Sequence, residues 1–263
     1  MSILEKIVRH KQQEIVELKT RTSLEEIRQV ASEVEPPLDF LAALKGAPPI
    51  RLIAEVKKAS PSQGIIREDF DPVAIASDYQ RAGAACLSVL TDREFFQGEL
   101  EFIKLIRAAE IKLPILRKDF IIDPIQVWEA RSCGADAVLL IAECLEAEQL
   151  KLLYGEIQEA GMVALVELYE EKNISAVMDL KPLLVGVNNR NLQTFKVDLN
   201  HCLRMKEKMG GSPCFVAESG IFTFEDAKCL QAAGVDAMLV GQSLCQQSDV
   251  YSATKSLLGT NPA

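Results

Sequence analysis

Charged side chains stand at the ends of several short apolar runs in this chain of 263 residues. Glu55 and Lys57 close the first run, two residues apart and therefore on one face of a strand. Lys118, Glu167 and Arg190 follow three later runs. A charge beside buried apolar residues costs desolvation free energy unless it is paired. A structural ion pair explains any one of them equally well. Five charges near one rim instead favour acid–base catalysis, for which a lysine and a glutamate are suitable partners.

Two glycines stand where two further apolar runs end. Gly220 follows the run centred on Val216, and Gly241 follows the run centred on Leu239. A helix start is expected after each of them. Glycine lets a phosphate group approach backbone N–H groups closely, and a helix N-terminus adds a favourable dipole. A tight turn explains either glycine alone, but two at neighbouring runs predict a phosphate site.

Eight apolar runs recur along the chain, separated by segments with helical periodicity. Their centres are Ile53, Leu87, Ile115, Leu139, Leu165, Val185, Val216 and Leu239. Near-continuous apolar runs are typical of parallel strands buried on both faces. We therefore expect an α/β fold, a closed (β/α)8 TIM barrel, with its chemistry at the C-terminal ends of the strands. A doubly wound open sheet is the alternative, but the first strand lacks the G-x-G-x-x-G turn of dinucleotide-binding sheets.

The N-terminal part of the chain precedes the first run. It is predicted to be helical to about Ser32, with a capping box formed by Ser23 and Glu26. This part is too short to hold a core of its own. We assign residues 1–48 to an N-terminal helical extension packed on the barrel and residues 49–263 to the catalytic barrel.

The composition excludes several classes of protein. With 29 Lys and Arg against 38 Asp and Glu, the formal net charge of −9 argues against nucleic-acid binding. No apolar run approaches the roughly 18 residues that span a bilayer, and the N-terminus has no hydrophobic segment typical of a secretory signal. Seven cysteines without a C-x-x-C pair favour free thiols in a reducing cytoplasm. Two histidines cannot build a three-histidine zinc site. We expect a cytoplasmic protein without metal or membrane contact, compatible with a monomer.

The neighbours of the charged residues raise two further expectations. Phe95 and Phe96 lie in a loop at the predicted catalytic rim, where either packing or an aromatic substrate would explain two phenyl rings. Arg117 and Asp119 flank Lys118 and are predicted to pair with each other toward the outer helices.

Taken together, these strings resemble those of indole-3-glycerol phosphate synthases, barrel enzymes of tryptophan biosynthesis. The resemblance extends from residues 4–8 to the eighth run. The matching segments are 55–62, 90–92 with 95–96, 116–120, 166–167, 187–192, 217–221 and 240–241. Asn191 stands where the family commonly has aspartate, and Gln242 where glutamate or serine is usual. Only the finer phosphate contacts depend on these two positions.

The resemblance implies a reaction and roles for three residues. The reaction closes 1-(2-carboxyphenylamino)-1-deoxyribulose 5-phosphate to indole-3-glycerol phosphate, with loss of carbon dioxide and water and with no metal or organic cofactor. Lys118 is then the general acid at the ribulose carbonyl, and Glu167 is the general base of the dehydration. Lys57 holds the substrate carboxylate or phosphate, or shares the acid role.

The other implied site residues complete two groups. In the catalytic group, Glu55 orients the two lysines, Asn188 contacts polar substrate groups and Ser219 assists positioning. The implied substrate- and phosphate-binding group is Ser60, Phe96, Phe120, Arg190, Glu218, Gly220, Gly241 and Gln242.

Two other functions remain open at this stage. A phosphosugar aldolase on the same barrel would use Lys57 or Lys118 to form a Schiff base. A non-catalytic subunit that binds a phosphorylated metabolite is the second alternative, because fold alone does not dictate function. Borohydride with substrate would trap a covalent adduct of an aldolase but not of the synthase. Indole absorbance that appears on incubation with the anilino-ribulose phosphate would identify the synthase.

Overall fold

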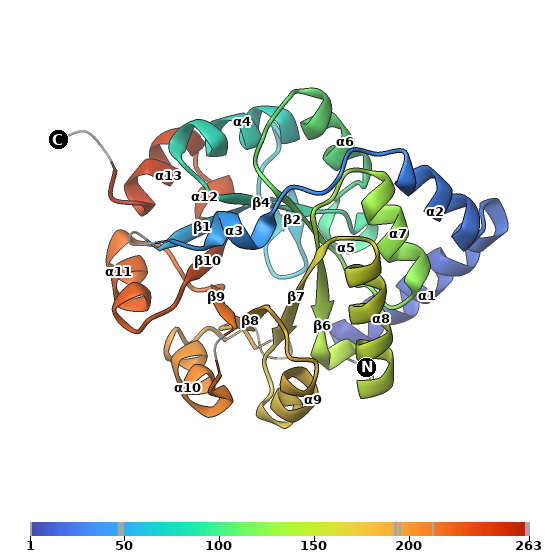
Figure 1. Cartoon of the computed structure of the whole chain (residues 1–263). Helices are drawn as coiled ribbons and strands as arrows, with labels where there is room; N and C mark the ends of the chain where they lie inside the picture. Colours follow the sequence, from blue (N-terminus) through green and yellow to red (C-terminus); the bar gives the residue numbers. More distant parts are fainter. Residues whose placement is uncertain (1, 47–49, 192–193, 195, 212, 261–263) are drawn as a thin grey trace.

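Eight parallel strands form a closed barrel surrounded by helices in the computed structural model, which describes residues 2–46, 50–191, 194, 196–211 and 213–260 (Figure 1). Each predicted apolar run falls on one strand, so the expected (β/α)8 barrel is confirmed. The barrel strands are β1 (Arg51–Val56), β4 (Cys86–Leu90), β5 (Ile115–Lys118), β6 (Ala137–Ile141), β7 (Val163–Leu168), β8 (Leu184–Asn188), β9 (Cys214–Glu218) and β10 (Ala237–Val240). A small hairpin of β2 (Ala59–Ser60) and β3 (Gly64–Ile65) follows β1.

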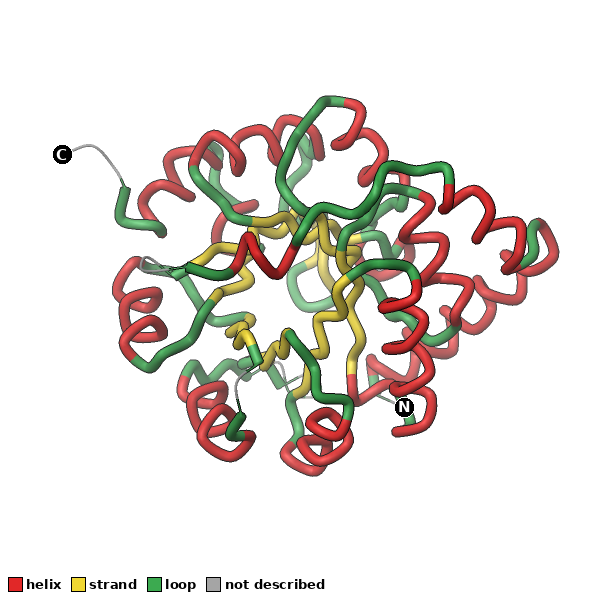
Figure 2. The backbone as a smooth tube through the Cα atoms, viewed as in Figure 1, coloured by secondary structure: helices red, strands yellow, loops and turns green. Residues whose placement is uncertain are grey.

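Helices alternate with these strands and cover the outside of the barrel (Figure 2). They are α4 (Pro72–Ala82), α5 (Arg93–Phe96), α6 (Glu101–Ala108), α7 (Pro124–Ser132), α8 (Ala147–Glu159), α9 (Ile174–Asp179), α10 (Asn200–Met209), α11 (Phe224–Ala232), α12 (Gln242–Cys245) and α13 (Val250–Leu257). Two 3-10 turns lie at Ala142–Cys144 and Glu171–Asn173. None of the described helices is long and apolar enough to cross a membrane.

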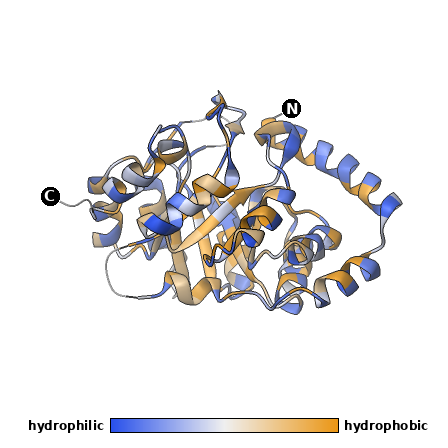
Figure 3. Cartoon of the chain, turned by 90° about the horizontal axis from the view of Figure 1, so that it is seen from above, coloured by the Kyte–Doolittle hydropathy of each residue, from blue (hydrophilic) through white to orange (hydrophobic). Residues whose placement is uncertain are grey.

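The two largest apolar clusters of the core lie inside the barrel and between strands and helices, and a third, smaller cluster joins the N-terminal extension to α7. Strand side chains alternate between the two largest clusters: in β1, Ile53 belongs to the inner cluster, whereas Leu52 and Ala54 belong to the outer one. The strands are accordingly hydrophobic along most of their length (Figure 3). By the same alternation Arg117 faces outward, where it pairs with Asp119 at 3.2 Å. The predicted outward pair is therefore confirmed.

The N-terminal extension wraps around one side of the barrel. It consists of α1 (Ile3–Arg21), α2 (Leu24–Ser32) and α3 (Phe40–Leu44). The predicted capping box is present, because Ser23 accepts from the Glu26 N–H and Glu26 accepts from the Ser23 N–H. That cap starts a new helix, so the stretch predicted to be helical to about Ser32 is divided in two. The predicted boundary between residues 48 and 49 lies outside the described residues.

The two ends of the extension close opposite ends of the barrel. Helix α3 crosses the ring of strands in Figure 2 and buries Phe40 completely against the inner cluster. Helix α1 lies at the other end, where Ile3, Leu4 and Ile7 line the pocket at the C-terminal ends of the strands. Between them α2 packs on α7. The extension therefore contributes directly to the site.

Candidate active site

A pocket of about 170 Å³ opens at the C-terminal ends of the barrel strands. All of the predicted site residues line it, so the structure brings together side chains from seven of the eight strands or their loops. They are Glu55, Lys57, Ser60, Phe96, Lys118, Phe120, Glu167, Asn188, Arg190, Glu218, Ser219, Gly220, Gly241 and Gln242. The two histidines of the chain, His10 and His201, are not among the lining residues.

The alternation of the strands explains why these residue types meet. Lys118 is two residues beyond Leu116, and Glu167 is two residues beyond Leu165, and both leucines belong to the inner cluster. The strand register sets Asn188 opposite Glu218 in the adjacent strand. The polar side chains therefore form the top layer of an otherwise apolar barrel interior, where water is largely excluded.

At the centre of this layer, the Lys118 ammonium bridges two buried carboxylates. Its Nζ lies 2.5 Å from Oε2 of Glu167 and 2.8 Å from Oε2 of Glu218. Asn188 donates to the other oxygen of Glu167 at 3.1 Å. In the first strand, Lys57 Nζ lies 3.1 Å from Oε1 of Glu55. The pocket thus holds two lysine–glutamate pairs, the combination expected of an acid–base site.

The two carboxyl groups that share Lys118 are driven to opposite protonation states. Burial alone would raise the pKa of Glu167, but the Lys118 ammonium and hydrogen bonds from Lys118, Glu218 and Asn188 lower it below the usual value. Burial, together with the Glu167 charge, raises the pKa of Glu218. Burial opposes the charge on Lys118, yet the surrounding carboxylates raise its pKa above the usual lysine value. Glu167 is therefore suited to act as a base beside a proton-holding neighbour.

Two glycines leave room for the carboxylates. A Cβ atom at Gly186 would lie 2.2 Å from Oε1 of Glu218, and one at Gly241 would lie 2.2 Å from Oε1 of Glu55. Gly241 was predicted to admit a phosphate; the structure adds a second reason for glycine there. Gly186 was not predicted, and its position inside an apolar strand is the signal that could have identified it.

The loop after β9 is held in an unusual conformation at the pocket. Ser219 and Gly220 both have positive φ angles, 66° and 77°. For a serine this conformation is uncommon and costs of order 1 kcal/mol. The carbonyl of Ser219 accepts a hydrogen bond from Asn189 at 3.2 Å. The backbone at this edge of the pocket is therefore fixed by its surroundings.

The expected helix starts differ between the two glycine loops. Helix α12 begins at Gln242, directly after Gly241, as predicted. Helix α11 begins at Phe224, four residues beyond Gly220, and Thr223 provides its N-cap. Arg190 Nη2 donates to the Gln242 side chain at 3.3 Å, so a guanidinium stands beside these loops.

Glu218, grouped with the implied substrate- and phosphate-binding residues, lines the pocket, and its carboxyl group accepts a hydrogen bond from Lys118. Asn191, one of the two departures from the family pattern, accepts from the Thr194 N–H within its own loop. Residue 192 of that matching segment lies outside the described residues.

One side of the pocket is aromatic. The ring centroids of Phe96 and Phe120 are 6.1 Å apart, and Lys57 Nζ lies 5.5 Å from the centroid of Phe96. Phe95 does not line the pocket and instead packs edge-on against His10 of α1. Of the two adjacent phenylalanines, one belongs to the site and the other to its packing. Sequence reasoning also missed Ile3, Leu4 and Ile7, because nothing local places a helix over the pocket.

A comparison with known families agrees with this site. The family model described as indole-3-glycerol phosphate synthase matches residues 4–257. The chain belongs to this family. It is 48% identical over 99% of its length to the indole-3-glycerol phosphate synthase of Rhodopirellula baltica, all of which is covered. It is 46% identical to that of Chromobacterium violaceum, with 97% of each chain covered. It is 42% identical to the chloroplastic enzyme of Arabidopsis thaliana, over 99% of this chain and 67% of the relative.

Solved structures give the fold. A 3-hexulose-6-phosphate synthase matches with a TM-score of 0.65 over 80% of this chain and 99% of its own, at 16% identity. The Streptococcus mutans protein titled KGPDC matches with a TM-score of 0.61 over 81% of this chain and 97% of its own, at 13% identity. At such identities the likeness shows the barrel alone. Family membership gives the activity: the protein is a carboxy-lyase of tryptophan biosynthesis, acting on a phosphorylated substrate.

The space left by Gly186 is open to a direct test. In Gly186→Ala, the added methyl group must shift Oε1 of Glu218, and the same carboxyl group bonds to Lys118 through Oε2. We expect kcat to fall about 10- to 100-fold, because small misplacements of catalytic groups have effects of this size. Gly155→Ala in α8 is the matched control, since its Cβ would have no neighbour within 4 Å. Unchanged kcat in Gly186→Ala, with the control also active, would contradict the assigned role of the space.

The raised pKa of Glu218 predicts how stability depends on pH. In the unfolded chain a glutamate has a pKa of about 4.3. As pH rises above that value, the unfolded state loses a proton that the folded state retains, so this group makes the folded state less stable. We expect the gain in unfolding free energy from Glu218→Gln to be larger at pH 9 than at pH 5, measured by urea denaturation. Glu207→Gln, at an exposed position, is the control. An equal gain in unfolding free energy for Glu218→Gln at pH 5 and pH 9 would contradict the raised pKa of Glu218.

Proposed function

We propose that this pocket performs the ring closure of 1-(2-carboxyphenylamino)-1-deoxyribulose 5-phosphate with Lys118 as general acid and Glu167 as general base. The observation that supports these roles is the Lys118 ammonium held by Glu167 and Glu218 at 2.5 and 2.8 Å in the top layer of the barrel. The lowered pKa of one carboxyl and the raised pKa of the other provide a base and a proton reserve beside the same ammonium.

In the first step Lys118 protonates the ribulose carbonyl while the aromatic carbon that bears the carboxylate attacks it. A carbon–carbon bond forms, the carbonyl oxygen becomes a hydroxyl and the positive charge resides on the aryl nitrogen. Loss of carbon dioxide returns the electron pair of the broken bond to that nitrogen. Glu218, whose pKa is raised, lies 2.8 Å from Lys118. It can therefore replace the proton that Lys118 gave to the carbonyl oxygen.

In the second step the hydroxyl leaves as water and the ring becomes aromatic. Glu167 removes the ring proton, and the Lys118 ammonium, which has regained its proton from Glu218, protonates the leaving hydroxyl. The hydrogen bond from Asn188 fixes the orientation of Glu167 for this transfer. The products are indole-3-glycerol phosphate, carbon dioxide and water, which balances the reaction.

The substrate lies between an aromatic end and an anion end. The aryl ring packs at Phe96 and Phe120, with Lys57 on the substrate carboxylate, since the Lys57 ammonium already lies near the Phe96 ring. The phosphate binds at the Gly220 and Gly241 loops. N–H groups of these loops, with Gln242, Arg190 and Ser60, supply donors there. Glu55 orients Lys57, and Ser219 positions the loop.

Three broader assignments belong to the same proposal. The extension comprises residues 1–48, and the catalytic barrel comprises residues 49–263. The enzyme is a monomer. It acts in the cytoplasm. The formal charge of −9 supports the absence of a nucleic-acid partner. All seven cysteines are described as free thiols, as in a reducing compartment.

The general acid can be tested by removing its amine. In Lys118→Ala the ribulose carbonyl has no proton donor, so we expect kcat to fall by about 10²- to 10⁴-fold, the usual contribution of general acid catalysis. Formation of indole absorbance from the anilino-ribulose phosphate measures it, and circular dichroism verifies the fold. The exposed Lys151→Ala in α8 should retain full turnover. Near-normal turnover of Lys118→Ala would refute the role. A covalent adduct trapped by borohydride with the wild type would instead favour Schiff-base chemistry.

A further inference from the structure

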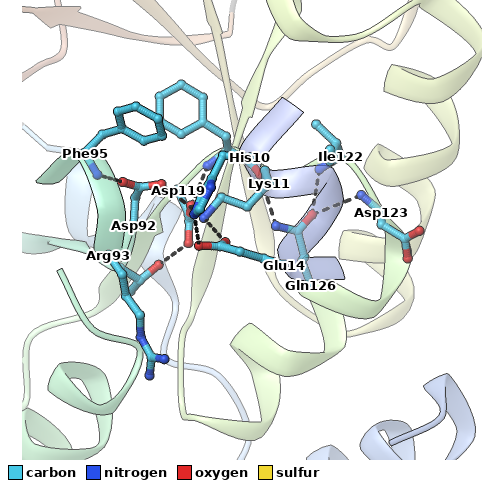
Figure 4. Close-up of polar contacts among 12 residues, drawn as sticks. His10, Lys11, Glu14, Asp92, Arg93, Phe95, Asp119, Ile122, Asp123 and Gln126 are labelled. Carbon is cyan, nitrogen blue, oxygen red and sulfur yellow. Dashed lines mark hydrogen bonds and ion pairs between the residues drawn. The ribbon is translucent and has the colours of Figure 1, made fainter. Parts of the chain in front are cut away.

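A buried lysine of the N-terminal extension stands apart from the acid–base residues. Lys11 of α1 is only 3% exposed and does not line the pocket. Its Nζ lies 3.0 Å from Asp119, 3.1 Å from Asp92 and 2.6 Å from Glu14 (Figure 4). Asp92 follows β4 and Asp119 follows β5. One ammonium thus joins the extension to two adjacent loops at the catalytic end of the barrel.

Each of these two barrel carboxylates holds a segment that carries a ring of the pocket. Asp92 accepts from the Phe95 N–H at 2.8 Å and caps α5, whose last residue is Phe96. Asp119 accepts from the Phe120 N–H at 2.8 Å. Because Lys11 bridges the two acids, it also links the two segments on which the aromatic wall depends.

Asp92 depends on Lys11 more strongly than Asp119 does. Asp119 also accepts from Thr91 at 2.6 Å and pairs with Arg117 at 3.2 Å. Asp92 is fully buried, and apart from the Lys11 ammonium its Oδ2 has no partner among the described residues, so this ammonium is what compensates its charge. Burial raises the pKa of Asp92 even beside this ammonium. Without Lys11 the loop before α5 would hold an uncompensated buried charge.

We propose that Lys11 is a positioning residue for substrate binding. By bridging Asp92 and Asp119, its ammonium fixes the spacing of the two aromatic rings of the pocket. The same contacts hold α1 in place, so that the apolar side chains at its start close the mouth. The inference rests on the proposed placement of the substrate's aryl ring against these rings.

The acid–base groups do not depend on this bridge. Lys118, Glu167 and Glu218 are side chains of β5, β7 and β9, and none of them contacts Lys11. Within the described residues, the ion pairs of Lys11 are with Glu14, Asp92 and Asp119, and none is with the loops after β9 and β10. Lys11 therefore acts on recognition of the aromatic end and leaves both the chemical step and the binding of the anion unchanged.

Kinetics of Lys11→Met in the full chain test this separation. We expect KM for the anilino-ribulose phosphate and the inhibition constant of indole-3-glycerol phosphate to rise about tenfold, the size of a modest loss of apolar contact. The inhibition constant of inorganic phosphate and kcat should stay within about threefold of wild type, since their groups are elsewhere. The ratio of the two inhibition constants is the deciding quantity, because general loosening of the fold would change both.

Two further variants separate positioning from stability. Lys19→Met removes another ion pair between α1 and the barrel, 2.6 Å from Asp123, and should leave both inhibition constants unchanged. Lys11→Met/Asp92→Asn removes the uncompensated charge, while the amide oxygen can still cap α5. This double variant should regain the melting temperature lost in Lys11→Met but keep the raised inhibition constant of indole-3-glycerol phosphate.

Three outcomes would overturn the proposal. The first is that folded Lys11→Met has the wild-type inhibition constant for indole-3-glycerol phosphate. The second is that Lys11→Met loses affinity equally for both inhibitors. The third is that Lys11→Met/Asp92→Asn regains wild-type binding of indole-3-glycerol phosphate. The last would show that Lys11 only neutralises Asp92. Failure of indole-3-glycerol phosphate to inhibit the wild type would overturn the aryl placement itself, and this proposal with it.

Discussion

The site depends on one ammonium group shared by two carboxylates at the top of an apolar barrel. Lys118 gains enough from Glu167 and Glu218 to stay charged where water is scarce, and the two acids cannot both ionise as readily beside each other. The outcome is a charged base, a proton-holding acid and a proton donor within hydrogen-bond distance. The neighbours of each group set its protonation state, and these are the states that the proposed reaction needs.

Two features of the barrel make this arrangement possible. Strand side chains alternate strictly between the inside and the outside of the barrel, and glycines leave space for the carboxyl groups. Interior positions are apolar up to Leu116 and Leu165, and the next inward positions carry the charge. Glycine at 186 removes a side chain where Glu218 needs space. The extension adds what the strands cannot, an apolar cover above the mouth and an ion cluster that anchors it to the loops. The barrel and the extension therefore both line the pocket.

The barrel, the interior direction of Lys118 and Glu167 and the outward pair beside them could all be predicted from the sequence, because strand periodicity determines which face a side chain takes. The pairing of charged side chains with one another inside the barrel could not be predicted in this way. Periodicity places Glu218 inside but does not show that it shares Lys118 with Glu167. It cannot separate Phe95 from Phe96 either, since that depends on how α1 lies over the loop. Contacts between distant segments, such as Lys11 with Asp92, have no local signature.

The most direct test of the account is the titration of the Lys118 side chain by ¹⁵N nuclear magnetic resonance of labelled lysine. We predict that Lys118 stays an ammonium at pH values where exposed lysines have lost their proton. Glu167→Gln should lower the pKa of Lys118, because one of the three carboxylates that raise it is gone. A Lys118 signal that titrates at or below the usual lysine value in the wild type would show that the neighbouring carboxylates do not stabilise its ammonium form in solution.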